Sequence, residues 1–279
     1  MSEAITGAQI ERIVEIVRQA AKAEIMPRFR SLETADIKTK SDQHDLVTEA
    51  DLAAEAYLRR ALAEVFPDAL IVGEESISAD PSLRGKIGDA PLAVILDPVD
   101  GTWNFANGLP LFGVILAITV FGRPIFGLLY DPVVDDWIIG DAARQTKLIR
   151  DGGQSQALDV SNGGDVSEMT GFIHFYLLPK EKQAQMGVLL PNIGRSWSLR
   201  CSCHEYRLIA QGRADFVISG TLNPWDHAAG VLAVEQAGGV ARMLDGRDYN
   251  AGIETGYLLA APSEESWEQL CRAFAFLSE

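Results

Sequence analysis

The stretch Val94-Ile95-Leu96-Asp97-Pro98-Val99-Asp100-Gly101-Thr102-Trp103-Asn104-Phe105 begins as an apolar run and ends in two aspartates, a glycine and a threonine. This pattern is typical of a buried strand that delivers polar groups to an open sheet edge. Pro98 has a fixed φ and no N–H group, so it stiffens the turn between Asp97 and Asp100. We therefore expect both carboxylates to face one cation.

The two residues that follow Asp100 favour an anion site beside that cation. Gly101 and Thr102 offer backbone N–H groups and a hydroxyl where a turn opens toward a short helix. The same string also fits an ordinary turn without chemistry, because Asp, Pro and Gly each favour turns. The stretch alone leaves both interpretations open.

The composition of the chain is that of a globular protein, with 279 residues, 47% of them hydrophobic and 23% charged. The net charge is −15, from 24 Lys and Arg against 39 Asp and Glu. A field of this sign repels nucleic-acid backbones and anionic membrane surfaces. We therefore expect no nucleic-acid or membrane partner, and we expect an anionic substrate to need local cations such as bound divalent metal.

Three features predict a soluble, cytoplasmic protein. The N-terminal residues 1–4 show no secretory signal. The longest apolar run, residues 111–121, is too short to span a bilayer. The three cysteines, Cys201, Cys203 and Cys271, form an odd set that suits a reducing compartment.

Carboxylates recur at predicted strand exits and helix starts. Thr48 and Asp51 precede an amphipathic helix over residues 52–66, where they fit a capping box worth about 1 kcal/mol. Glu74 follows a short apolar strand, and Asp226 lies in the first turn of a helix that opens after Asn223. Each of these acids also has a purely structural explanation, which stays open. Asp51 fits a helix cap, Glu74 fits a solvated loop, and Asp226 fits a helix-dipole interaction.

Hydrophobic periodicity predicts two lobes. Residues 1–150 read as an α+β lobe, with a helix over residues 8–26 and an antiparallel meander of strands over residues 111–139. The glycines of Asp151-Gly152-Gly153 mark the predicted boundary. Strands and helices alternate over residues 151–279, which predicts an α/β lobe. Residues 77–91 read as a connecting loop.

Four motifs, in order, resemble the signatures of the inositol monophosphatase family: LVTEAD at 46–51, GEES at 73–76, DPVDGTWNF at 97–105 and WDHAAG at 225–230. The resemblance covers nearly the whole chain. It implies a five-layered αβαβα sandwich, usually a homodimer, that hydrolyses small phosphate monoesters with Mg²⁺ and metal-activated water. Oxygen ligands without zinc-type Cys/His spacing agree with Mg²⁺.

The resemblance also implies a set of metal ligands. Glu74, Asp97 and the carbonyl of Val99 would hold one Mg²⁺. Asp97, Asp100 and Asp226 would hold a second, so that Asp97 bridges the two. Glu74 would contact a third, weaker ion through water.

The remaining roles that the resemblance implies concern water and phosphate. Thr102 and Glu74 would orient and deprotonate the attacking water, and Asp51 would accept a hydrogen bond from Thr102. Backbone N–H groups of Gly101 and Thr102 would bind the phosphate oxygens. Lys40 would face the metal site and offset part of its negative charge.

Two departures from the family pattern concern the choice of substrate. Arg200-Cys201-Ser202 stands where inositol-specific members carry Gly-Thr-Ala, and Ser219 stands where they carry a Glu that receives sugar hydroxyls. Arg200 would suit a second phosphate or a carboxylate. We therefore expect a substrate other than, or broader than, myo-inositol monophosphate, with fructose 1,6-bisphosphate, histidinol phosphate and adenosine 3′,5′-bisphosphate as the alternatives.

Two other functions stay open. A haloacid-dehalogenase-type phosphatase forms an aspartyl-phosphate on a DxDGT motif, but this chain has the spacing DxxDGT and the GEES motif has no place there. A non-catalytic metal-binding regulator would share the fold, although no ligand position is substituted. The cysteines of Cys201-Ser202-Cys203-His204 are expected to pack as small apolar residues, and His227 to support or cap the helix.

Overall fold

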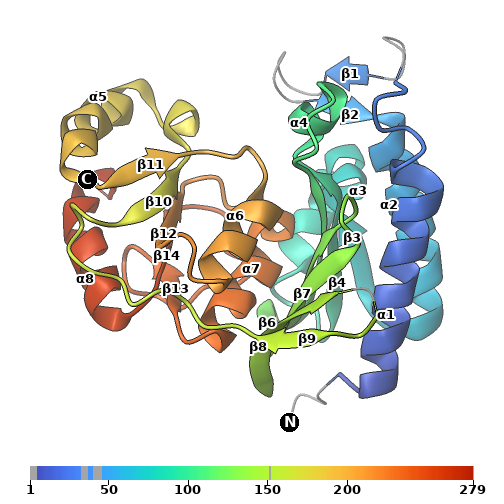
Figure 1. Cartoon of the computed structure of the whole chain (residues 1–279). Helices are drawn as coiled ribbons and strands as arrows, with labels where there is room; N and C mark the ends of the chain where they lie inside the picture. The colour runs from blue at the N-terminus through green and yellow to red at the C-terminus, as the bar shows by residue number, and fades with distance from the viewer. Residues whose placement is uncertain (1–4, 33–36, 40–45, 151, 279) are drawn as a thin grey trace.

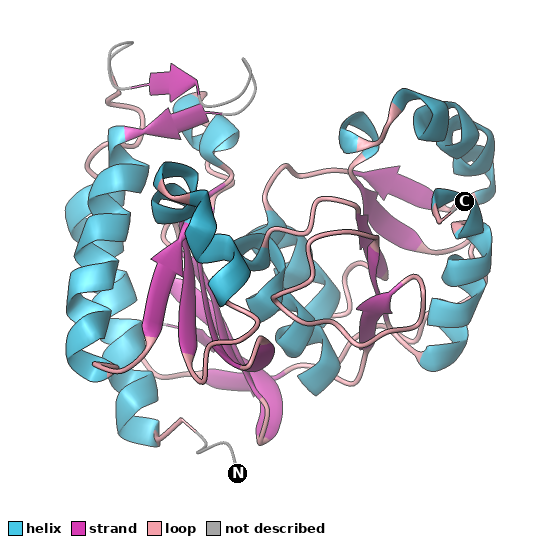
Figure 2. Cartoon of the chain, turned by 180° about the vertical axis from the view of Figure 1, so that it is seen from behind, coloured by secondary structure: helices cyan, strands magenta, loops and turns pink. Residues whose placement is uncertain are grey.

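The computed structural model describes residues 5–32, 37–39, 46–150 and 152–278. Its secondary structure is stacked in five layers, helix, sheet, helix, sheet and helix, as Figure 1 shows from one side and Figure 2 from behind. The N-terminal half of the chain supplies the first two layers, and the C-terminal half supplies the last three. The predicted α/β class and αβαβα sandwich are confirmed.

The first outer layer consists of two long helices. Helix α1 (Gly7–Ala20) begins at a capping box between Thr6 and Gln9 and continues into a π-helical turn, Ala21–Ile25. Helix α2 (Glu49–Val65) follows a short antiparallel hairpin of β1 (Ile37–Thr39) and β2 (Leu46–Thr48). Both helices bury one apolar face against the first sheet, which is the expected behaviour of an amphipathic surface helix.

The second layer is a seven-stranded sheet whose strands follow the order of the chain. Its first two strands are parallel, and every later neighbour is antiparallel, so the predicted meander is confirmed. Short helices flank its second strand. The elements are β3 (Leu70–Gly73), α3 (Glu74–Ala79), a 3₁₀ helix (Pro81–Lys86), β4 (Ala93–Asp100), α4 (Thr102–Ala106), β5 (Gly113–Val120), β6 (Arg123–Asp131), β7 (Asp136–Asp141), β8 (Arg144–Arg150) and β9 (Ser155–Ala157).

The middle layer holds α6 (Ser202–Ala210) and α7 (Pro224–Gln236) between the two sheets. Helix α7 is buried on all sides along residues 227–234, as a helix in the centre of a molecule should be. It packs so closely on the first sheet that a Cβ atom at Gly127 would lie 2.7 Å from the Ala229 backbone. Glycine at this position of β6 is therefore required by the close approach of α7.

The last two layers are a five-stranded sheet and two covering helices. Strands β11, β10 and β12 are parallel, and β14 and β13 complete the sheet in antiparallel pairing. Apolar side chains, among them Phe216 and Phe274, fill the space between this sheet and its covering helices. The elements are β10 (Thr170–Ile173), α5 (Lys180–Leu189), β11 (Arg195–Trp197), β12 (Phe216–Ser219), β13 (Val240–Met243), β14 (Leu258–Ala261) and α8 (Glu264–Ala273), with 3₁₀ turns at Phe175–Leu177, Leu190–Asn192 and Ala275–Leu277.

The structure differs from the sequence-based expectations at three places. The glycines predicted to mark the lobe boundary form a turn within one sheet, because β8 pairs with β9 across it and Gly152 and Gly153 both have positive φ. The chain changes sheet only between Ala157 and Thr170. The expected strand at residue 133 starts at Asp136, after a turn with Asp135 at φ +54°. Residues 77–91 are partly helical.

No helix among the residues described is both long enough and apolar enough to cross a membrane.

Candidate active site

Strand β4 brings Asp97 and Asp100 to one side of the sheet edge by a β-bulge. Side chains alternate between the two faces of a strand, so residues three apart would normally point in opposite directions. Asp97 pairs with Ile115 and Asp100 with Gly113, so one extra residue is inserted on β4 at this point. The bulge contains Pro98, which cannot donate to a ladder hydrogen bond. This is the physical reason that the DPVD spacing makes a convergent pair.

Asp226 joins the pair from the first turn of α7, which begins at Pro224. Carboxylate oxygens of Asp97, Asp100 and Asp226 all lie within 4.8 Å of one another. Asp97 and Asp100 are only 2% and 7% exposed. The Asn223 side-chain amide donates to Asp226 Oδ2 at 3.1 Å and fixes the carboxylate. The structure thus brings together the three side chains predicted to hold the second metal.

The electrostatics of this cluster favour a cation. Burial, followed by the charges of Glu74, Asp100 and Asp226, raises the pKa of Asp97 well above its ordinary value. Burial and the neighbouring carboxylates raise the pKa of Asp226 in the same way. Burial raises the pKa of Asp100 to about 6 despite three hydrogen bonds that lower it. Three crowded oxygen donors of this kind fit a hard divalent cation, which would relieve their repulsion.

The N-terminus of α6 holds the Asp100 carboxylate. The backbone N–H groups of Ser202 and Cys203 donate to its two oxygens, at 3.2 and 2.5 Å, and the Cys201 thiol donates at 3.1 Å. Burial raises the pKa of the Cys201 and Cys203 thiols well above the ordinary value, so both remain protonated. The two cysteines are buried, free thiols, in agreement with the expectation that they pack as small residues.

Asp51 both caps helix α2 and contacts the Thr102 hydroxyl, the two roles that the sequence left open. Its Oδ2 accepts hydrogen bonds from the N–H and hydroxyl of Thr48 at 2.8 and 2.6 Å, which completes the capping box of α2. Its Oδ1 lies 3.1 Å from Thr102 Oγ1, and the same hydroxyl lies 3.0 Å from the carbonyl of Val99. The cap therefore orients a buried carboxylate toward the hydroxyl at the edge of β4.

Glu74 is the first residue of α3, directly after β3. A residue outside the predicted site holds the start of this helix. Glu55, buried in α2, accepts hydrogen bonds from the N–H groups of Glu75 and Ser76 at 2.8 and 2.9 Å. Its signal was an acidic residue one turn after Asp51 on the apolar face of an amphipathic helix, where only a partnered carboxylate is expected.

Most of the predicted site residues line one cavity of about 940 Å³. Asp51 and Val99 are not part of its lining and reach it only through their contacts with the Thr102 hydroxyl. Gly101 adopts φ +89° at the edge of the cavity, and a Cβ atom there would lie 3.0 Å from the Leu111 carbonyl. Ser219 donates its hydroxyl to the Thr221 carbonyl at 3.1 Å. Lys40 lies outside the described residues. The lining includes Glu74, Asp97, Asp100, Gly101, Thr102, Trp103, His174, Tyr176, Arg200, Ser219 and Asp226.

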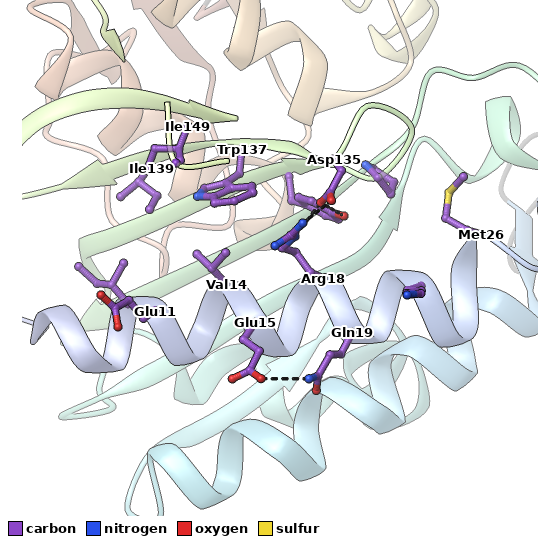
Figure 3. Close-up of a pocket in the computed structure, with 15 residues that line it drawn as sticks. Glu11, Val14, Glu15, Arg18, Gln19, Met26, Asp135, Trp137, Ile139 and Ile149 are labelled. Carbon is purple, nitrogen blue, oxygen red and sulfur yellow. Dashed lines mark hydrogen bonds and ion pairs between the residues drawn. The ribbon is translucent and has the colours of Figure 1, made fainter. Parts of the chain in front are cut away.

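A second groove, of about 900 Å³, lies between α1 and strands β7 and β8 and shares no lining residue with the first. Figure 3 shows Arg18 of α1 and Asp135 joined across it, beside Trp137. Arg18 Nε donates to Asp135 Oδ1 at 2.7 Å. The acidic cluster therefore belongs to the first cavity alone among the described residues.

Comparison with known proteins agrees with this geometry. The inositol monophosphatase family model matches residues 8–279. A histidinol-phosphatase of Streptomyces coelicolor is 30% identical over 85% of this chain and 87% of its own length. The Nus factor SuhB of Haemophilus influenzae is 30% identical over 91% of this chain and 92% of its own length.

A solved inositol monophosphatase from Zymomonas mobilis superposes with a TM-score of 0.76 at 26% identity, covering 95% of both chains. The match to the family model, the sequence relatives and the shared fold agree with one another. They place this chain, a hydrolase of phosphate monoesters, in the inositol monophosphatase family.

Proposed function

We propose that the chain hydrolyses a small-molecule phosphate monoester with two Mg²⁺ ions and a third, more weakly held ion near Glu74. The convergence of Asp97, Asp100 and Asp226 within 4.8 Å carries this proposal. Glu74 lines the same cavity, and its charge is felt by both Asp97 and Asp226. The site lies beside the hydroxyl of Thr102, which is the arrangement that a hydrolytic reaction needs.

The resemblance to the family implies two overlapping ligand sets. Glu74, Asp97 and the carbonyl of Val99 would hold one ion, and Asp97, Asp100 and Asp226 the other. When bound, the ions would lower the pKa of a water molecule and offset the charge that develops on the phosphate and the departing alcohol.

The chain's own groups would position that water and the phosphate. Thr102 Oγ1 contacts Asp51 and the Val99 carbonyl, so its hydrogen is engaged and its lone pairs are available to accept a hydrogen bond from water. Glu74 would take the proton that the water loses. The N–H groups of Gly101 and Thr102, at the start of α4, would bind phosphate oxygens.

Three further residues would contact the substrate. Arg200 and Ser219 line the cavity and come from the C-terminal half of the chain. Lys40 would offset the negative charge of the site. We propose that these positions direct the enzyme toward a substrate other than, or broader than, inositol monophosphate; fructose 1,6-bisphosphate, histidinol phosphate and adenosine 3′,5′-bisphosphate remain the alternatives.

Phosphate release tests the proposal. The purified chain is incubated with each of these esters in excess Mg²⁺ or in EDTA, and inorganic phosphate is measured. We expect release from at least one ester in Mg²⁺, none in EDTA, and a loss of at least about 100-fold in Asp97→Asn. Release that is unchanged in EDTA would contradict the proposed metal dependence.

A non-catalytic regulator is the second candidate, and one relative is named a Nus factor. Absence of release from every ester, together with Mg²⁺ binding, would favour it.

We also propose a cytoplasmic homodimer. Large apolar side chains that are exposed in the C-terminal half and lie outside the cavity lining, including Phe175, Val188 and Trp197, support a dimer contact, and light scattering on the purified chain measures its mass.

A further inference from the structure

Arg200 has a backbone conformation that arginine rarely adopts. Its φ is +54°, in the left-handed region that favours glycine, and it directly precedes Cys201 at the start of α6. A Cβ atom makes this conformation unfavourable, so a glycine would occupy the position at lower cost. An arginine that persists in such a conformation points to a use for its side chain.

The backbone around Arg200 is held from both sides. The Asn104 side-chain amide, from α4, donates to the carbonyls of Leu199 and Arg200 at 2.9 and 3.4 Å. The Glu205 carboxylate, from α6, accepts the N–H of Leu199 at 2.8 Å. The Ser198 hydroxyl accepts the N–H of Arg200 at 3.2 Å. The position of the Arg200 Cα is therefore fixed by groups on two different elements.

The guanidinium group of Arg200 is also held in place. Its central carbon lies 4.4 Å from the ring centre of Trp103 and 5.4 Å from that of Tyr176. Aromatic rings contact a guanidinium through its flat faces, whereas hydrogen bonds to an anion form at its edge. Trp103, Tyr176 and Arg200 all line the cavity that contains Asp97 and Asp226.

The acid Glu205, which holds the backbone beside Arg200, has a histidine as its side-chain partner. His174 Nε2 lies 2.7 Å from Glu205 Oε2, and Glu205 is only 1% exposed. Burial alone would lower the pKa of His174, but the Glu205 carboxylate outweighs burial and the pKa is raised. Within the described lining of the cavity, Arg200 is the only arginine or lysine.

We propose that Trp103, Arg200 and Tyr176 form a clamp for a second anionic group, a phosphate or a carboxylate, on the alcohol half of the substrate. The inference rests on the proposed function, since it concerns the part of the ester that leaves. The clamp would be preorganised, because both the backbone and the guanidinium of Arg200 are fixed before the substrate arrives. Asn104 and Glu205 act as positioning residues for it.

Matched ester pairs that differ only in the second group test the clamp. One pair is 3-phosphoglycerate and glycerol 3-phosphate, which differ by a carboxylate in place of a hydroxymethyl group. The other pair is fructose 1,6-bisphosphate and fructose 1-phosphate, which differ by a second phosphate. Wild type should show a kcat/KM at least roughly tenfold higher for the more anionic member of one pair, and that pair identifies the anion.

Arg200→Gln should lower kcat/KM for the favoured ester by about 10- to 100-fold. It should change kcat/KM for the ester that lacks the second anionic group less than about threefold. Arg195→Gln, at an exposed arginine of β11 outside the cavity, is the control and should change neither ester. Arg200→Gly, whose backbone suits φ +54°, should keep the melting temperature near that of wild type and show the same selective loss.

The clamp is wrong if wild type prefers neither anionic ester, or if Arg200→Gln lowers both members of the pair equally. These outcomes differ from a failure of the proposed function, in which no ester in the panel releases phosphate. Selective loss in Arg200→Gln that is partly restored in Arg200→Lys would support recognition of charge over a purely structural role.

Discussion

At the scale of single residues, the site gathers side chains whose charges oppose folding. Asp97, Asp100 and Asp226 have raised pKa values because they are buried beside one another. Each keeps its place through hydrogen bonds that are made without any metal, as the Asn223 amide does for Asp226. The cluster is thus built for a partner that the polypeptide itself does not supply.

Asp226→Asn separates this electrostatic cost from the chemistry. Asparagine keeps an oxygen that accepts from the Asn223 amide but removes one of the crowded charges. The metal-free melting temperature should therefore stay the same or rise, whereas kcat/KM should fall at least about 100-fold. Calorimetry and phosphate release measure the two quantities. Asp245→Asn, at an exposed carboxylate paired with Arg247, is the control for charge removal. A parallel loss of stability and activity would argue against a metal ligand at residue 226.

At the scale of elements, three helix starts and one bulge assemble the site. The bulge of β4 turns Asp100 to the same side as Asp97, and the N–H groups at the start of α6 hold its carboxylate. Helix α7 contributes Asp226, and helix α3 contributes Glu74. The N-terminus of α3 depends on Glu55, whose carboxylate spans from α2 to two N–H groups. This one side chain connects the outer helical layer to a candidate metal ligand.

Glu55→Gln should weaken that connection. The amide retains one acceptor oxygen, so one N–H group of α3 loses its partner, and the free energy of unfolding should fall by about 1–3 kcal/mol. Activity should fall as well, because Glu74 is the first residue of α3 and would be displaced when the start of that helix loosens. Urea denaturation measures the first effect. Glu64→Gln, on the exposed face of α2, should leave both quantities unchanged. Equal stability of Glu55→Gln and wild type would contradict the role assigned to Glu55.

The sequence predicted local elements better than the contacts between them. The capping box at Thr48, the amphipathic face of α2 and the meander strands follow from neighbouring residues, so periodicity and cap chemistry were enough. The glycines at 152 and 153 were misjudged because a glycine pair marks a hairpin as readily as a linker, and only the pairing of β8 with β9 decides.

The candidate site shows the same division. The motifs predicted that Asp97, Asp100 and Asp226 converge, although only the bulge explains how. Glu205 and His174 are 31 residues apart in the chain and form a buried pair that no local pattern indicates. Tertiary contacts of this kind depend on the whole fold, and a single sequence carries no direct signal of them.

At the scale of the whole molecule, two sheets share a central helical layer, and the cavity draws its lining from both halves of the chain. Asp97 and Asp100 come from the first sheet, whereas Asp226 and Arg200 come from the layer and loops that follow it. Binding a cation between them should therefore stabilise the entire fold. The effect should depend on pH, because protons compete with the metal for the same oxygens.

The sign of that dependence follows from the raised pKa values. Carboxylates that bind protons more tightly in the folded state stabilise the metal-free protein at low pH, and this contribution is lost as the pH rises through their folded pKa, about 6 for Asp100. Excess Mg²⁺ should therefore raise the melting temperature more at about pH 8 than at about pH 5. Glu235, with a pKa of about 7, titrates in the same range but cancels in the difference with and without Mg²⁺. An equal shift at both pH values would contradict this account.

Crystals grown with Mn²⁺ in place of Mg²⁺ test the central claim most directly, because anomalous scattering locates each ion. The account predicts anomalous peaks in the cavity, one within coordination distance of Asp97, Asp100 and Asp226, and one beside Asp97, Glu74 and the Val99 carbonyl. Peaks confined to other parts of the surface, or an acidic cluster without any peak in saturating Mn²⁺, would contradict it.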